Sequence, residues 1–339
     1  MTQSGRSAQR PFPSVLATKL NRVTEDSGMF DLPIRTLVLV VSVTILACSA
    51  ELPDQTSNRL VAIGDLHGDI ESARRAFQLA GAIDQSDQWV GKDLTVIQLG
   101  DTIGRSYQDR EVLDFLLALQ LKAASGGGQL HLLIGNHEVF AARLELRWVH
   151  DDAYESFASI PGLDLDDPRL ADVPQHQRPR GAALLPGGHY ATQLSDHSAV
   201  LRVGDTIFAH GGVTPHWAKY GIDQINEDVE RWFKGETDEP VSTLGMDPGN
   251  FDDSVMQSRH FSREVADCEM LGESLRILGA NRMVVAHTVH QSITSKCDGR
   301  VWAIDTGMSR YYGGPIEVLE IVGDSNVSVV RTATTSLAP

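Results

Sequence analysis

Basic side chains are scarce in this chain of 339 residues. Lys and Arg together number 29 against 45 Asp and Glu, which gives a formal net charge of −16 at pH 7. Proteins bind nucleic acid nonspecifically through Lys and Arg at the phosphates. The deficit of basic residues therefore argues against nucleic acid as a partner. Internal repeats and low-complexity tracts are also missing from the sequence.

Cysteine is equally scarce, because the chain has only three, at Cys48, Cys268 and Cys297. Cys48 follows an apolar segment near the amino terminus. Cys268 and Cys297 could form a disulfide in an oxidising compartment. Their spacing does not specify a bridge, so two free thiols are an equal alternative.

The apolar segment near the amino terminus, 37–47, is too short to cross a bilayer, which takes about 20 apolar residues. It has instead the length of a signal-peptide core. Arg35 precedes it, and Ile45-Leu46-Ala47-Cys48 at its end resembles the lipobox of a bacterial lipoprotein. We therefore expect residues 1–47 to be a signal peptide, with Met29 as the alternative start of a more compact signal.

A lipid on Cys48 would make residues 48–57 a short membrane tether. The folded domain would then lie in the cell envelope and face the periplasm. Ser49 follows the cysteine where an Asp would favour the inner membrane, so the outer membrane is the preferred location. A plain secretory signal or an uncleaved anchor is the alternative.

Five short apolar runs, rich in Val, Ile or Leu, each stop at residue types that bind metals. Such runs are typical of strands buried on both faces of a sheet. The runs are Leu60–Ile63, Thr95–Leu99, Leu130–Ile134, Thr206–Ala209 and Met283–Ala286. The blocks that follow are Gly64-Asp65-Leu66-His67, Gly100-Asp101, Gly135-Asn136-His137-Glu138, His210-Gly211-Gly212 and His287-Thr288. Ligands bind at the carboxyl edge of open α/β sheets, so the blocks predict one shared metal site.

The order of these blocks over residues 58–329 resembles that of the calcineurin-like metallophosphoesterases. Pro186-Gly187-Gly188 before the His-Gly-Gly block and Ile304-Asp305-Thr306-Gly307 after the last histidine look most like the bacterial Shewanella-like protein phosphatases. The resemblance implies an α/β fold, a two-sheet sandwich flanked by helices. It also implies a metal-dependent phosphomonoester hydrolase.

The resemblance further implies two divalent metal ions as cofactors. Asp65 and His67 would hold the first ion, Asp101 would bridge both, and Asn136, His210 and His287 would hold the second. Such ligands suit Mn, Fe or Zn, and the absence of Cys from the blocks argues against a structural zinc. Two ions roughly 3.5–4 Å apart can generate hydroxide and stabilise an in-line displacement. We expect direct attack of metal-bound hydroxide, without a covalent phosphoenzyme.

His137 is left outside this ligand set and is the expected general acid, which would protonate the leaving alkoxide or phenoxide. Arg105 is expected to face the phosphate. Arg259 is expected to be a second phosphate-binding residue, because a planar guanidinium can hold two phosphate oxygens. The alternative for Arg259 is an ordinary surface charge.

One block departs from the family pattern, Gly-Asp-x-x-Asp-Arg-Gly. The chain has Gly100-Asp101-Thr102-Ile103-Gly104-Arg105-Ser106, so Gly104 replaces the carboxylate that orients the catalytic histidine. Loss of such a partner commonly lowers metal affinity or activity about 10–100-fold at a metal site. We therefore expect the general acid His137 to be weakened, or to be oriented by a different partner. Asp109, a few residues later, could substitute.

The rest of the chain alternates helical and strand patterns. Apolar residues at helical spacing predict helices over Asp69–Ala80 and Asp109–Ala124, which would cover the sheet. The pattern weakens between Arg143 and Gly181, which predicts an irregular helical insertion. Substrate choice would reside there and in 214–261. Residues 330–339 would be a tail.

The favoured substrates are phosphomonoesters, with phosphorylated Ser, Thr or Tyr of proteins before small phosphomonoesters. A phosphoesterase of nucleotides or dinucleoside polyphosphates is the enzymatic alternative. Because of Gly104, a catalytically weakened lipoprotein that binds phosphate is the alternative from another class. The sequence leaves the oligomeric state open.

Overall fold

The structure is a computed structural model that describes residues 59–240, 244, 251–323 and 325–332. Several predicted segments lie outside the described residues, namely the signal peptide, the Met29 start, Cys48 and its tether, and residues 333–339 of the predicted tail. Residues 330 and 331, predicted as the start of that tail, instead belong to a strand. No helix of the described part is long and apolar enough to span a membrane.

The first sheet has five strands in the order β10-β9-β1-β2-β3. Its members are β1 (Arg59–Ile63), β2 (Thr95–Gln98), β3 (Gln129–Leu132), β9 (Glu317–Val322) and β10 (Asn326–Arg331). Strands β1, β2 and β3 run parallel, with Leu60 opposite Thr95 and Val96 opposite Leu130. Strand β9 pairs antiparallel with β1, and β10 pairs antiparallel with β9 at the edge of the sheet.

The second sheet also has five strands, in the order β4-β5-β6-β8-β7. Its members are β4 (Val200–Val203), β5 (Thr206–Ala209), β6 (Arg282–Val285), β7 (Thr294–Lys296) and β8 (Val301–Ala303). The three central strands are parallel, while β4 and β7 pair antiparallel at the edges.

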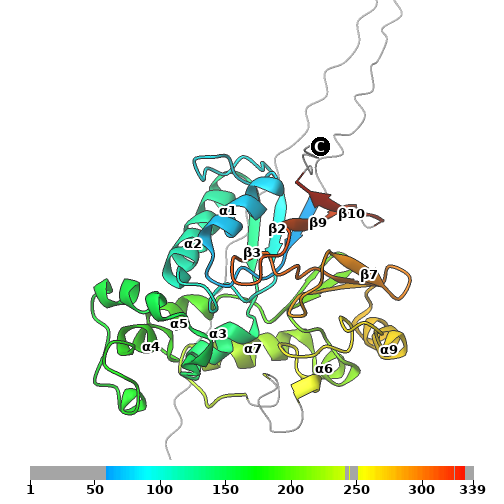
Figure 1. Cartoon of the computed structure of the whole chain (residues 1–339). Helices are drawn as coiled ribbons and strands as arrows, with labels where there is room; N and C mark the ends of the chain where they lie inside the picture. Colours follow the sequence, from blue (N-terminus) through cyan, green and yellow to red (C-terminus); the bar gives the residue numbers. More distant parts are fainter. Residues whose placement is uncertain (1–58, 241–243, 245–250, 324, 333–339) are drawn as a thin grey trace, which may run out of the picture. The chain divides into compact units, whose positions relative to one another are not determined.

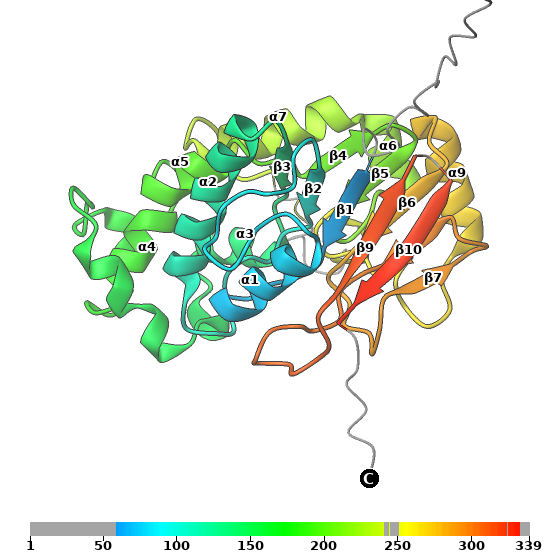
Figure 2. The same cartoon turned by 90° about the horizontal axis from the view of Figure 1, so that it is seen from above.

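The two sheets pack face to face, because alternate strand residues point into a shared apolar layer. In β1, Leu60 and Ala62 join Phe208 and Val284 of the second sheet in one buried cluster. Val61 and Ile63 point to the opposite face of β1, against α1 (Ile70–Leu79) and α2 (Asp109–Ser125). The predicted two-sheet sandwich is therefore confirmed (Figures 1 and 2).

Three helices cover the outer face of the second sheet, namely α6 (Pro215–Tyr220), α7 (Ile222–Phe233) and α9 (Cys268–Leu278). A short turn, η6 (Phe251–Asp253), lies between α7 and α9 along the chain. The sulfur atoms of Cys268 and Cys297 form a disulfide across 29 residues, so of the two alternatives the structure contains the bridge. It joins the start of α9 to the turn between β7 and β8.

The helices expected at Asp69–Ala80 and Asp109–Ala124 are present as α1 and α2. Asp69 caps α1, because its carboxylate accepts from the N–H groups of Glu71 and Ser72 at 3.2 and 3.3 Å. Such a cap satisfies backbone donors that the first helical turn leaves unpaired. Helix α1 ends at Leu79, two residues before Gly81, and α2 ends at Ser125, directly before Gly126.

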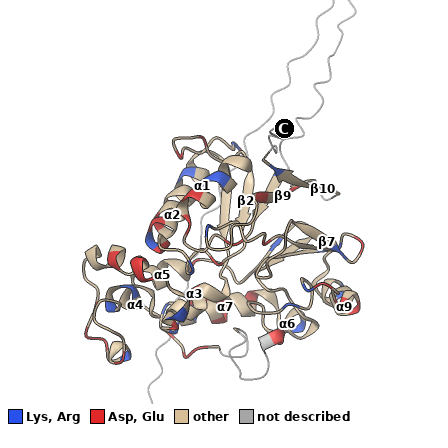
Figure 3. Ribbon diagram, in the orientation of Figure 1, with Lys and Arg blue, Asp and Glu red and all other residues tan. Residues whose placement is uncertain are grey.

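The stretch from Arg143 to Gly181 is built mainly from single helical turns. After α3 (Asn136–Ala142) come η2 (Leu146–Trp148), η3 (Asp151–Ala153), η4 (Glu155–Ser159), η5 (Pro168–Leu170), α4 (Arg178–Leu184) and α5 (His189–Leu194). Its own small apolar cluster contains Leu170, Val173, Ala182 and Leu185. Acidic and basic side chains are interspersed along the helices and loops of the described part (Figure 3).

Candidate metal centre

The six predicted ligands and His137 lie together at the carboxyl ends of β1, β2, β3, β5 and β6. Asp65 and His67 follow β1, Asp101 follows β2, Asn136 and His137 open α3, and His210 and His287 follow β5 and β6. Apart from His287, each of these side chains belongs to a residue that is at most 5% exposed. The parallel strands bring these ends to one place, as the sequence predicts.

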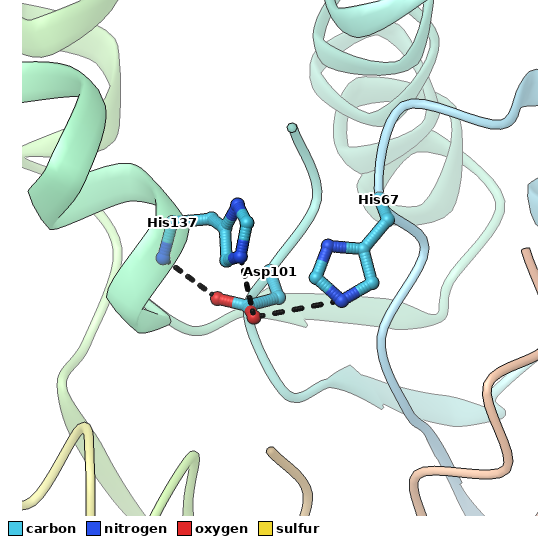
Figure 4. A group of neighbouring side chains, drawn as sticks. All are labelled: His67, Asp101 and His137. Carbon is cyan, nitrogen blue, oxygen red and sulfur yellow. Dashed lines mark hydrogen bonds and ion pairs between the residues drawn. The ribbon is translucent and has the colours of Figure 1, made fainter. Parts of the chain in front are cut away.

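Asp101 is the centre of this group. Its Oδ2 atom lies 3.7 Å from Nε2 of His67, and its Oδ1 atom lies 3.3 Å from Nε2 of His210. Two sets of ligand atoms, each within 4.8 Å of one another, therefore share this aspartate. They are His67, Asp101 and His137, and Asp101, His210 and His287. Figure 4 shows His67 and His137 on either side of the Asp101 carboxylate.

The two remaining predicted ligands, Asp65 and Asn136, each lie next to one of these sets. Oδ2 of Asp65 lies 3.6 Å from Nε2 of His67. The side-chain oxygen of Asn136 lies 2.9 Å from Nε2 of His210. The sequence placed His137 outside the ligands, whereas the structure brings its Nε2 to 4.0 Å from Oδ2 of Asp101, as near to one set as a ligand would be.

The backbone of the site is bent in an uncommon way. His67, Asp101, Arg105 and His287 have φ angles of 48°, 51°, 71° and 65°. Side chains other than glycine rarely adopt this left-handed region, which costs of order 1–3 kcal/mol per residue when the surroundings enforce it. Such bends turn each side chain off the strand end and into the shared site.

Glu138 is a residue of the site whose role the sequence analysis missed. Its buried carboxylate accepts from the N–H groups of Gly135 at 2.8 Å and of Asp101 and Thr102, each at 2.9 Å. It also accepts from the Thr102 hydroxyl at 2.7 Å. One carboxylate thus joins the loops after β2 and β3 and holds the backbone of Asp101. Its place in the Gly135–Glu138 block was the available signal.

Asp305 is the second residue that the sequence analysis did not assign. It follows β8 and is 1% exposed, with Oδ1 accepting from the N–H of Gly307 at 2.8 Å. Burial raises the pKa of Asp305, and Asp305 together with burial raises the pKa of Asp65 well above its usual range. Two carboxylates crowd the same buried space, which is unfavourable without a cation.

The histidines of the centre have different protonation tendencies. Burial lowers the pKa of His210, but Asp101 and Asp65 more than offset this and raise it to about 9. Burial lowers the pKa of His137 to about 3, against the attraction of Asp101. Burial and the neighbouring His210 hold the pKa of His287 well below its usual value. Neutral imidazoles are the form that binds metals.

The donors present fit divalent cations. Within the described residues, Oδ2 of Asp65, Nδ1 of His67, Nε2 of His287 and Oδ2 of Asp305 are buried without a hydrogen-bond partner. Orphaned polar atoms are costly in a protein interior. Carboxylate, amide and imidazole donors around a shared aspartate suit Mn, Fe or Zn, and bound cations would satisfy the unpaired lone pairs.

The two predicted phosphate-binding arginines lie near the centre. The guanidinium of Arg105 stacks 4.2 Å from the ring of Trp148, and its Nε is buried without a partner among the described residues. Arg259 is exposed and donates from Nη1 to the Thr288 hydroxyl at 3.0 Å and to the His287 carbonyl at 3.4 Å. It therefore lies beside a predicted ligand, at the edge of the site.

Asp109 does not take the place of the missing carboxylate directly. Its Oδ1 accepts from the N–H of Gly104 at 2.7 Å, and its Oδ2 accepts from Arg180. Both oxygens are therefore bound to groups other than the His137 ring. Asp109 can therefore influence His137 only indirectly, through the backbone of Gly104 beside the ring.

Known proteins are similar to this chain in sequence and in fold. The family described as calcineurin-like phosphoesterase matches residues 58–291. The Shewanella-like protein phosphatase 2 of Arabidopsis thaliana is 36% identical, over 81% of this chain and 78% of that protein. Shewanella-like protein phosphatase 1 of Plasmodium berghei is 28% identical, over 81% and 74%.

Solved structures agree on the fold. The cold-active protein-tyrosine phosphatase of a psychrophilic Shewanella species has a TM-score of 0.61 at 21% identity, covering 81% of this chain and 80% of that one. A protein serine/threonine phosphatase from Saccharomyces cerevisiae has a TM-score of 0.54 at 12% identity, covering 82% and 81%. With the strand-end aspartates and histidines in one place, the matches establish that this chain belongs to the calcineurin-like phosphoesterase family and is a phosphoester hydrolase.

Proposed function

We propose that the protein is a phosphatase of phosphorylated proteins, with phosphotyrosine as the first substrate. The observation that carries this proposal is the aromatic rim, defined as Trp148, Tyr311 and Tyr312, around the guanidinium of Arg105. Trp148, Tyr311 and Tyr312 lie 4.2, 5.3 and 5.9 Å from that guanidinium. Tyr311 and Tyr312 are 56% and 39% exposed.

Such a rim suits an aryl phosphate ester. A phenyl ring can stack against exposed aromatic faces while its phosphate meets the guanidinium, and each aromatic pair contributes roughly 0.5–1.5 kcal/mol. The names of the Shewanella-like phosphatases and of the tyrosine phosphatase with the same fold add support.

The metal centre would be formed by the residues that the sequence predicts. Asp65 and His67 would hold one ion, Asn136, His210 and His287 the other, and Asp101 both. When bound, the ions supply Lewis-acid activation of the attacking water and of the phosphoryl group. Arg105 and Arg259 would hold the phosphate oxygens bidentately.

His137 would protonate the leaving oxygen. Burial lowers the pKa of His137 to about 3, so its ring is neutral at neutral pH in the protein alone. A phosphate dianion close to the ring favours the protonated form and raises this pKa. The role as general acid therefore depends on bound substrate, and it matters most for leaving groups that are poor anions.

The experiment compares Mn²⁺-loaded protein on phosphotyrosine, phosphoserine and phosphothreonine peptides, on nucleotides and on diadenosine tetraphosphate. We expect the phosphotyrosine peptides to give the highest kcat/KM. Preference for nucleotides or diadenosine tetraphosphate would favour the small-molecule alternative. Turnover no higher than that of His137→Ala would favour a phosphate-binding protein.

We also propose that the protein is anchored in the cell envelope through Cys48. The support is the Ile45-Leu46-Ala47-Cys48 segment, and the Cys268–Cys297 disulfide suits an oxidising compartment. In bacteria given radiolabelled palmitate, the full-length chain should become labelled and Cys48→Ser should not. Equal labelling of both, or of neither, would contradict the anchor.

A further inference from the structure

The loop from Gly104 to Asp109 carries Arg105 and borders His137, and two contacts from the helical insertion hold Asp109 and Arg105 of this loop. One contact is made by Arg180 of α4, and the other by Trp148 of η2. Both residues lie in the stretch from Arg143 to Gly181, and α4, which carries Arg180, is labelled at the lower left of Figure 1.

Arg180 and Asp109 form a buried ion pair. Nε and Nη2 of Arg180 donate to Oδ2 of Asp109 at 3.0 and 2.6 Å, and the two side chains are 2% and 0% exposed. The other oxygen of Asp109 accepts from the N–H of Gly104 at 2.7 Å. The guanidinium therefore orients a carboxylate that in turn fixes the backbone beside His137.

Trp148 holds the next residue of the loop. Its carbonyl accepts from the N–H of Arg105 at 2.7 Å, and its indole stacks 4.2 Å from the guanidinium of the same arginine. Arg105 also has a φ of 71°, which an arginine adopts only when its surroundings enforce it. Trp148 thus holds the Arg105 backbone through its carbonyl and the direction of the Arg105 side chain through its indole.

We infer that Arg180 and Trp148 are positioning residues: the insertion uses them to hold Arg105 toward the phosphate and Gly104 against His137. The inference rests on the proposed phosphatase function. Neither residue reacts with substrate in this role. Phosphate binding by Arg105 then depends on the insertion, and a change in the insertion changes catalysis without touching a metal ligand.

A purely structural role is the competing explanation, because removing one partner of a buried ion pair leaves an uncompensated charge and destabilises the fold. A double-mutant cycle separates the two. Arg180→Met, Arg105→Met and the double variant are compared by calorimetric titration of the Mn²⁺-loaded protein with inorganic phosphate. We expect Arg180→Met to weaken phosphate binding about 10–100-fold, as loss of a supporting partner does at metal sites.

In the Arg105→Met background, Arg180→Met should weaken phosphate binding little further, because the group it positions is gone. Independent, fully additive losses would overturn the inference. Arg180→Lys, which keeps the charge, should recover part of the binding. Arg59→Met is the control, since its pair with Glu320 lies on the first sheet, away from the site.

Hydrogen exchange supplies a readout that requires neither metal nor activity. In the metal-free protein, Arg180→Met should speed amide exchange in the peptide spanning 102–108, and Arg59→Met should not. If Arg180→Met does not fold, Trp148→Leu on the partly exposed η2 replaces it in the phosphate titration and should speed exchange in the same peptide. Unchanged exchange with either variant would contradict the inference.

The two proposals can fail separately. A wild-type protein that turns over no phosphoester would overturn the proposed function, while the exchange of residues 102–108 would still test the positioning. An active wild type whose phosphate affinity and exchange are unaffected by these variants would overturn the positioning alone.

Discussion

Nδ1 of His137 faces Gly104 so closely that a Cβ atom at position 104 would lie 2.3 Å from it. Real Cβ atoms essentially never come so near another heavy atom. Gly104 also has a φ of +81°, which favours glycine. The position where the family has a carboxylate is thus occupied by the imidazole itself, so the glycine is required by this backbone.

Restoring the family residue should therefore harm the protein. We expect Gly104→Asp and Gly104→Ala to lower kcat by about tenfold or more, because a displaced imidazole loses its orientation. The loss should be larger for aryl phosphates with poor leaving groups, which depend on protonation.

Gly127→Ala is the matched control for these glycine variants. Gly127 has a φ of +85° but nothing lies within 4 Å of its virtual Cβ. This control variant shows how much of a loss in kcat comes from backbone strain at a positive φ, without any collision with His137. Wild-type turnover by Gly104→Asp on poor leaving groups would show that the ring tolerates the carboxylate.

Glu138→Gln should weaken metal binding without changing a ligand. The Glu138 carboxylate accepts from the backbone N–H groups of Gly135, Asp101 and Thr102. In the variant, the amide nitrogen of the glutamine would face at least one of these donors and could not accept from it. We expect Mn²⁺ affinity, measured by calorimetry, to fall about 10–100-fold. Glu317→Gln, a buried glutamate on β9, is the control. Equal affinities for all three proteins would rule out the positioning role of Glu138.

His197 should make the fold sensitive to acid. Burial lowers the pKa of His197 to about 4, and neither ring nitrogen has a hydrogen-bond partner among the described residues. Because the folded pKa lies below the unfolded value, the stabilisation is complete above about pH 6.5 and is lost as pH falls toward 4. The loss approaches roughly 3 kcal/mol.

His197→Leu should abolish that part of the acid sensitivity. Urea unfolding at pH 7 and at pH 4.5 measures it, and the difference in unfolding free energy should shrink relative to wild type. The exposed His216, changed to Leu, is the control. An unchanged difference for His197→Leu would show that the buried imidazole does not titrate in this range.

The disulfide should stabilise the fold substantially. A bridge that closes a loop of 29 residues restricts the unfolded chain by about 3–4 kcal/mol. We expect Cys268→Ser with Cys297→Ser to lower the free energy of unfolding by that amount, measured in urea, with little change in kcat. Reduction of the wild type should have the same effect, and no effect of either would contradict the bridge.

The fold and the ligand positions could be predicted from sequence because their signals are local. A short Val-rich run predicts a buried strand, and the residue after it lies at the carboxyl edge whatever the strand order. Asp65, Asp101 and His210 are found in this way. Helices α1 and α2 likewise follow from apolar spacing and their terminal residues.

Contacts between side chains far apart in the chain could not be predicted. Glu138 is adjacent to predicted site residues, yet nothing local shows that it accepts from Thr102. The Arg180–Asp109 pair joins positions 71 residues apart, in a stretch without clear periodicity. Sequence also left the Cys268–Cys297 bridge open, because disulfide formation requires a Cα–Cα approach of 5.4 Å that only packing provides.

The amino-acid sequence by itself determined that the six predicted ligands reach one place at the strand ends, because strand periodicity and the strand-to-loop transition are properties of neighbouring residues. Tertiary structure alone decided how His137 and Arg105 are held. In the sequence, Gly104 indicates the loss of a carboxylate. In the folded protein, the His137 ring fills the space that a side chain at position 104 would need, and Asp109 accepts a hydrogen bond from the Gly104 N–H. Steric fit of this kind arises only when distant segments are packed together.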